Sequence, residues 1–182
     1  AIMAPNIPQY IISLHACLKF GVIEVPANVL YTVTELTNQF KDSGTETVIV
    51  LAPFAEKAIT IMKDPSTPVK RVIAIQIPGS PVEVEKGENI YDFNAIIGPA
   101  SDAEPDVAVY PSDITKLQYT GGTTGVPKGC VHTNEMNMTQ VVRTSEWLSM
   151  AAPAEDFRTL CAIPLNHIYG YNANVNICLY KV

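Results

Sequence analysis

Between residues 8 and 77 the sequence alternates two apolar patterns, and this alternation limits the fold more than any other feature. Residues 8–21 (PQYIISLHACLKFG) place apolar side chains at helical spacing, with Pro8 near the start and Gly21 at the end. This spacing predicts a helix. Residues 22–26 (VIEVP) then predict a short buried strand.

The alternation continues through two more helices and two more strands. Residues 32–35 (TVTE) form a capping box, which predicts a helix that runs to Gly44. Residues 47–52 (TVIVLA) and 71–77 (RVIAIQI) are rich in β-branched residues and predict strands, with a helix over 54–62 (FAEKAITIM) between them. Such alternation implies right-handed crossovers. The sequence therefore predicts an α/β fold with a largely parallel sheet flanked by helices.

The amino-acid composition changes after residue 77. Residues 78–111 are rich in Pro, Gly and acidic residues, which predicts surface loops around one short helix at 90–97 (IYDFNAII). Residues 113–120 (DITKLQYT) then predict a strand that ends at Thr120. We therefore divide the chain into a first α/β layer (1–110) and a second part (111–182).

The second part is predicted to continue with helices and one more strand. Residues 133–151 (TNEMNMTQVVRTSEWLSMA) predict a long helix capped by Thr133 or Asn134. Residues 157–165 (FRTLCAIPL) predict a strand, and residues 166–180 turn into a final helix.

Composition excludes several classes of protein. The 12 basic and 18 acidic residues give a formal net charge of −6, and no cluster of Lys and Arg forms a stripe that would suit nucleic acid. The four cysteines form no C-x-x-C pair, so we expect reduced and mostly buried thiols rather than a disulfide framework or a zinc site. No run of 18 apolar residues is present, and the first residues carry no basic signal region.

Residues 117–133 (LQYTGGTTGVPKGCVHT) are unlike the rest of the chain. Clustered glycines let backbone N–H groups approach an anion, threonine hydroxyls add donors, and Lys128 adds a cation, so the segment suits a polyphosphate. Pro127 and Gly129 rule out a Walker A loop, which needs glycine before the lysine and a hydroxyl after it. No G-x-G-x-x-G fingerprint is present either. The alternative is a flexible surface loop.

Residues 119–129 (YTGGTTGVPKG) closely resemble the phosphate-binding signature of the adenylate-forming superfamily. The usual signature has serine where this chain has Gly121, and TGGTTG preceded by LQY resembles the long-chain fatty acyl-CoA ligases. Residues 6–44 are similar to the early segment of such ligases, and residues 162–171 (AIPLNHIYGY) resemble the Pro-Leu-x-His motif of the family. The likeness thus extends over most of the chain.

This resemblance implies part of a large N-terminal domain and a reaction in two steps. A carboxylic acid, predicted to be a fatty acid, attacks Mg-ATP to give an acyl-adenylate and pyrophosphate, and coenzyme A then displaces AMP to give a thioester. ATP, Mg²⁺ and coenzyme A are the implied cofactor and co-substrates, and no nucleic acid is involved. Pro127 would set the direction of the loop, and the residues predicted to bind the ATP phosphates are Thr120, Gly121, Gly122, Thr123, Thr124, Gly125 and Lys128.

Three further residues are singled out by the resemblance. His167 matches the family histidine near the acyl carboxylate and α-phosphate, so His167 and Lys128 are the predicted catalytic residues. The alternative for His167 is a core or capping histidine. Tyr171 matches an aromatic residue at the acyl tunnel, or else it packs a helix against the sheet. We expect His15 to be structural and His132 to occupy a strand beside Val131.

Some family elements are absent from the sequence. The family has a Y-G-x-T-E segment, a ribose-binding aspartate and a lysine on a small C-terminal domain, and residues 169–173 (YGYNA) match the first of these only superficially. We therefore expect a fragment that is inactive alone and binds no metal through its own residues. The rival hypotheses are a nucleotide-binding module and a non-catalytic module. We expect a cytoplasmic protein, with association with the inner membrane face and a homodimer left open.

Overall fold

The computed structural model describes residues 1–120, 127–150 and 158–181. A four-stranded sheet of β1 (Ile2–Met3), β2 (Thr47–Leu51), β3 (Arg71–Ile75) and β4 (Ile90–Asp92) has the order β1-β2-β3-β4, and every pairing is parallel. The register of the central pair runs from Thr47 opposite Arg71 to Leu51 opposite Ile75. These strands confirm the prediction of an α/β fold with a largely parallel sheet.

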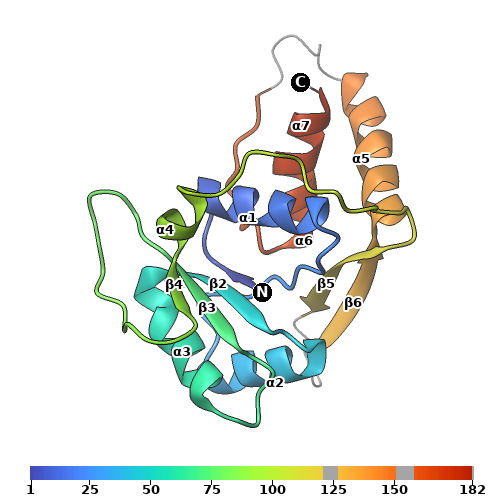
Figure 1. Cartoon of the computed structure of the whole chain (residues 1–182). Coiled ribbons are helices and arrows are strands. Elements are labelled where there is room, and N and C mark those ends of the chain that lie inside the picture. The colour runs from blue at the N-terminus through green and yellow to red at the C-terminus, as the bar shows by residue number, and fades with distance from the viewer. Residues whose placement is uncertain (121–126, 151–157, 182) are drawn as a thin grey trace.

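Helices cover both faces of this sheet (Figure 1). Helices α2 (Val33–Ser43) and α3 (Ala55–Lys63) lie on one face, and a turn of 3₁₀ helix, Ala52–Phe54, precedes α3. Helices α1 (Pro8–Lys19) and α4 (Phe93–Ile97) lie on the other. The predicted helices at 8–21, 32–44 and 54–62 are all present, with boundaries that differ by at most two residues.

The two faces of the sheet divide the core because side chains alternate along a strand. Val48, Val50 and the neighbouring Val72 and Ala74 pack with α2 and α3. Ile49, Leu51, Ile73 and Ile75 face the other way and pack with α1, Phe93 and the C-terminal helices. Burial on both faces explains why the strands are almost continuously apolar.

A second, antiparallel sheet consists of β5 (Ile114–Thr120) and β6 (Lys128–Thr133). Residues 24–26 connect the two sheets, because Pro26 bridges to Ile2 of β1 while Glu24 bridges to Lys116 of β5. The predicted strand at 22–26 is therefore reduced to two isolated bridges. The hairpin adds an antiparallel element that the alternation pattern did not predict.

The C-terminal part is helical. Helix α5 (Asn134–Ser149) begins after Thr133, whose hydroxyl accepts from the Met136 N–H, so Thr133 is the cap. Helix α6 (Ile168–Tyr171), a π-helical turn (Asn172–Asn176) and α7 (Ile177–Lys181) follow one another and pack beside α5 (Figure 1). None of the helices described for this chain is long and apolar enough to cross a membrane.

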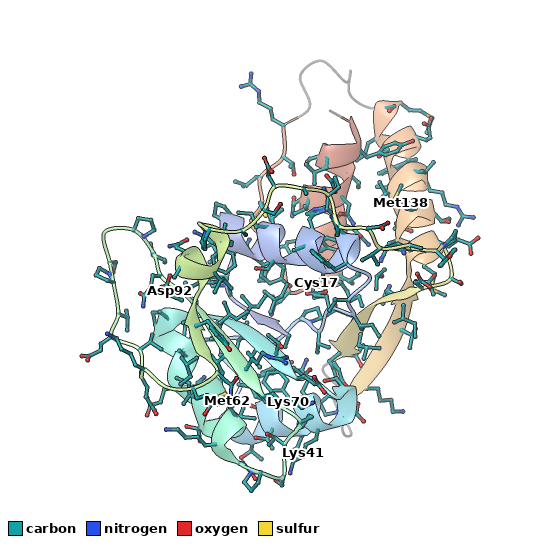
Figure 2. The ribbon with its side chains drawn as sticks, in the orientation of Figure 1. Cys17, Lys41, Met62, Lys70, Asp92 and Met138 are labelled. Carbon is teal, nitrogen blue, oxygen red and sulfur yellow. The ribbon has the colours of Figure 1, made fainter. Side chains whose placement is uncertain are left out.

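Three further sequence predictions are wrong. Residues 158–165 form no strand. Their backbone bonds to the side chain of Asn6 rather than to a neighbouring strand. Residues 90–92 of the predicted short helix pair with β3 as β4, and Asp92 (Figure 2) then caps the shorter helix α4. The cysteines are free, as expected, but they are not mostly buried: two are exposed and two are half-buried.

Candidate functional site

The hairpin β5–β6 flanks the glycine-rich segment. Thr120 at the end of β5 lies opposite Lys128 at the start of β6, and both residues are exposed. The predicted phosphate ligands Gly121, Gly122, Thr123, Thr124 and Gly125 lie outside the described residues. The structure therefore describes the two ends of the predicted phosphate loop and brings them side by side.

Tyr119 anchors this hairpin to α2. Its hydroxyl donates to the Asp42 carboxylate at 2.5 Å. A Cβ atom at Gly129, the cross-strand partner of Tyr119, would lie only 3.1 Å from the Tyr119 ring, so glycine makes room for the ring. Partial burial and then Asp42 raise the pKa of Tyr119 to about 12. The phenol thus stays protonated and keeps its bond to Asp42 at neutral pH.

His167 is an exposed residue that caps α6. Its Nδ1 accepts from the Tyr169 N–H at 3.2 Å, so in the neutral ring the proton is on Nε2, which can donate to an oxygen. The capping alternative raised by the sequence is therefore observed. Capping uses one ring nitrogen only and leaves the other for a ligand.

Asn6 holds the segment that leads to His167. Its Nδ2 donates to the carbonyls of Cys161 at 3.1 Å and Ile163 at 3.0 Å, and its Oδ1 accepts from the Leu165 N–H at 2.8 Å. Sequence reasoning missed Asn6, because a partner more than 150 residues away leaves no local signal. These bonds fix the path of the chain into the turn at residues 166–171, the His167 turn.

A cleft of about 290 Å³ joins the hairpin and the His167 turn. It is lined by the end of β5, the turn before His167 and the loop before α2: Pro26, Asn28, Tyr31, Gln118, Tyr119, Ile163, Pro164, Asn166 and His167. Gln118 spans it by donating from Nε2 to the Asn166 carbonyl at 3.0 Å. Sequence reasoning also missed Gln118, because β5 carries several polar residues and nothing in the sequence singles this one out. The structure thus brings His167 to the strand that ends at Thr120.

Tyr171 lies elsewhere, in the core, where it is 1% exposed. Burial, followed by the charge of Glu24, raises its pKa to about 12. The Lys116 ammonium lies over the Tyr171 ring, 4.0 Å from its centroid. Tyr171 lines a separate, mostly apolar groove of about 310 Å³ between α1, α5 and the C-terminal helices. The packing alternative is observed, and the acyl-site role of Tyr171 stays a prediction.

The remaining histidines occupy ordinary structural positions. His132 lies on β6 beside Val131, as predicted, and burial followed by Lys116 lowers its pKa. His15 is half-buried on α1, and burial followed by Lys19 lowers its pKa. Across residues 1–120, 127–150 and 158–181, no three His, Cys, Asp or Glu side chains are grouped to hold a metal ion.

Comparison with known proteins gives consistent matches along the chain. The profile of the family described as AMP-binding enzyme matches residues 1–181. The chain is 30% identical over 185 residues to 4-coumarate--CoA ligase 1 of Solanum tuberosum, covering 100% of this chain and 31% of that protein. It is also 30% identical over 200 residues to the long-chain-fatty-acid--CoA ligase of Bacillus subtilis (strain 168), covering 97% and 34%. The chain thus spans about a third of the length of these curated relatives.

Solved structures show the same fold. The apo structure of MbtA from Mycobacterium smegmatis superposes with a TM-score of 0.80 at 19% identity, covering 100% of this chain and 32% of that one. The anthranilate CoA ligase AuaEII in complex with anthranoyl-AMP gives a TM-score of 0.77 at 20% identity, covering 100% and 33%. With the family profile extending over residues 1–181, the conclusion is that this chain belongs to the AMP-binding enzyme family.

Proposed function

We propose that this chain is part of an enzyme that activates a carboxylic acid with ATP and transfers the acyl group to coenzyme A. The observation that carries the proposal is the cleft that His167 shares with the strand leading into the predicted phosphate loop. Adenylation needs the acid carboxylate and the α-phosphate to meet while the charge on pyrophosphate is stabilised. A histidine that shares a cleft with the strand leading into the predicted phosphate loop suits that requirement.

Thr120, Lys128 and the intervening glycines and threonines are the proposed ligands of the β- and γ-phosphates. Lys128 is exposed at the start of β6, so its ammonium is accessible to an anion. A charge-assisted bond from lysine would stabilise the negative charge that develops on pyrophosphate. Mg²⁺ would arrive with the ATP phosphates, and we assign none of the described residues to hold it, because no suitable cluster of side chains occurs among them.

His167 is the proposed contact to the reacting carboxylate. Since its Nδ1 accepts from the backbone, Nε2–H is the group that can donate to a carboxylate or α-phosphate oxygen. Such a donor would hold the acid in place and reduce repulsion between two anions. The proposed role is therefore orientation and charge stabilisation.

The relatives support two classes of acid substrate equally. The similarity to a 4-coumarate ligase and to a long-chain fatty acid ligase is 30% in each case, so an aromatic acid and a fatty acid are both proposed substrates. A fatty acyl chain would involve Tyr171 through the apolar groove between α1, α5 and the C-terminal helices. We place the enzyme in the cytoplasm, where ATP and coenzyme A are available, and contact with the inner membrane face stays a prediction.

The test is exchange of radiolabelled pyrophosphate into ATP by the full-length protein, with palmitate and 4-coumarate as separate substrates. We expect exchange with at least one acid, and Lys128→Ala should reduce it by about 100-fold, on the order of 3 kcal/mol for one lost oxyanion donor. The control is Lys63→Ala, an exposed lysine on α3, which should leave exchange unchanged. Binding of ATP without exchange for any acid would instead favour a nucleotide-binding module.

A further inference from the structure

A buried ion pair lies behind the cleft, where β5 meets residues 24–26. The side chains of Lys116 and Glu24 are 2% and 0% exposed, and Nζ lies 2.8 Å from Oε2. Tyr10 donates its hydroxyl to the other Glu24 oxygen at 3.0 Å. Two backbone bonds, from the Glu24 N–H to the Thr115 carbonyl and from the Leu117 N–H to the Glu24 carbonyl, hold the strands together. The ammonium of Lys116 is therefore held at one place.

The same ammonium lies over the ring of Tyr171, 4.0 Å from the centroid. A desolvated cation over an aromatic face is an attractive contact. The Tyr171 N–H donates to the His167 carbonyl at 3.1 Å, which closes the first turn of α6. Lys116 thus fixes the far end of the short helix that begins at His167.

Gln118 fixes the near end of that helix. It lies two residues beyond Lys116 on β5 and so on the same face of the strand. Its bond to the Asn166 carbonyl holds the residue before His167. Lys116 and Gln118 of β5 therefore contact the two ends of the turn at 166–171. The same strand continues directly to Thr120.

We propose that Lys116, neutralised by Glu24, is a positioning residue that sets the spacing between His167 and Thr120, where β5 leads into the predicted phosphate loop. The inference rests on the proposed function, because the spacing matters for the meeting of acid and ATP. Lys116 is absent from the cleft lining, so it acts through Tyr171 and through its own strand. A misplacement of about 1 Å between reacting groups can slow a reaction by about 100-fold.

The first experiment uses the double variant Lys116→Met/Glu24→Gln of the full-length protein. Both charges are removed together, because an unpaired buried charge would destabilise the fold strongly. Rapid mixing with ATP and acid gives a burst of pyrophosphate, whose amplitude counts folded sites and whose rate reports adenylation. We expect an unchanged amplitude, an unchanged KM for ATP and a burst that is about 10- to 100-fold slower.

The matched control is Lys63→Met/Glu85→Gln, which removes a surface pair on the far side of the molecule, beside Met62 on α3 (Figure 2). Its burst should match that of the parent. A double variant with reduced amplitude and a parental rate would show that the buried pair serves stability alone, and so would overturn the proposal. Tyr171→Leu, which keeps the ion pair, should also slow the burst at saturating acid, whereas loss of an acyl contact would raise the KM for the acid.

Hydrogen exchange gives a measure that is independent of activity. The amide of Tyr171 should exchange faster in Lys116→Met/Glu24→Gln than in the parent, while amides of β2 and β3 keep their protection. If the parent shows no burst with any acid, the proposed function fails, and the exchange measurement still decides whether Lys116 orders the turn. Equal protection of Tyr171 in both proteins would overturn the positioning role.

Discussion

At Gly170 the α6 backbone lies directly against the segment that precedes His167. A Cβ atom there would lie 2.3 Å from the Pro164 carbonyl oxygen and 2.9 Å from that of Ile163. Both atoms belong to the backbone and cannot rotate away as the end of a side chain could. The glycine in YGYNA is thus required for close packing of the His167 turn, a role unrelated to the Y-G-x-T-E motif that it resembles.

Replacement of Gly170 by alanine tests this contact. We expect Gly170→Ala to lower the free energy of unfolding by about 1 to 3 kcal/mol, because the turn must shift to accommodate the methyl group. Urea denaturation of the full-length protein measures the change. Gly87→Ala is the matched control, since its Cβ meets only the Ile90 side chain at 3.4 Å and should change stability by less than about 0.5 kcal/mol. Equal effects of the two substitutions would contradict the packing argument.

Among the elements, α2 shows both of its end signals in the sequence. Thr32 accepts from the Glu35 N–H while the Glu35 carboxylate accepts from the Thr32 N–H, so the capping box predicted from TVTE is present. Gly44 ends the helix in the left-handed region at φ 67°. No heavy atom lies within 4 Å of a Cβ built on Gly44, so backbone conformation alone requires glycine there.

The substitution Gly44→Ala should therefore destabilise the protein by about 1 kcal/mol, the cost of the left-handed conformation for an L residue. Gly44→Asn should cost less, because asparagine adopts this conformation more readily. Chemical denaturation of the full-length protein compares the three sequences. The opposite ranking, with alanine the better replacement, would mean that α2 ends in another way in solution.

The sequence predicted the elements whose signals are local. Capping residues, terminal glycines and β-branched runs defined α1, α2, α3, β2 and β3. The phosphate-binding role of the TGGTTG segment stays a prediction. The segment 158–165 was predicted wrongly because its apolar pattern suits a strand, whereas its structure depends on the distant Asn6. The contacts of Lys116 and Gln118 with the His167 turn were likewise unpredictable, since they join residues about 50 positions apart.

Over the whole molecule, exposed apolar side chains concentrate on α5. Met136, Trp147 and Met150 share one side of this helix and are 57%, 67% and 80% exposed. Met138, labelled on α5 in Figure 2, is 52% exposed on another side. Large apolar side chains gathered on one helix indicate a surface that avoids water.

We expect the 182-residue polypeptide to form dimers or larger species as its concentration rises. Sedimentation velocity measures the distribution, and Met136→Lys/Trp147→Lys should shift it toward the monomer because the apolar face gains two charges. Lys41→Met/Lys57→Met, which alters lysines of α2 and α3 away from α5, is the control and should leave association undiminished. A polypeptide that stays monomeric at high concentration would contradict this expectation.

The bridges from residues 24–26 to β1 and β5 also bear on the order of folding. Strands β2 and β3 pair across a short stretch of chain, whereas the contact of Glu24 with Lys116 closes a loop of about 90 residues. Closing a longer loop costs more chain entropy before any contact forms. During synthesis, we therefore expect the layer up to α4 to collapse while Glu24 still lacks its cation. The contact between the two sheets should form only after β5 has left the ribosome, so we expect docking of the hairpin to be a late step.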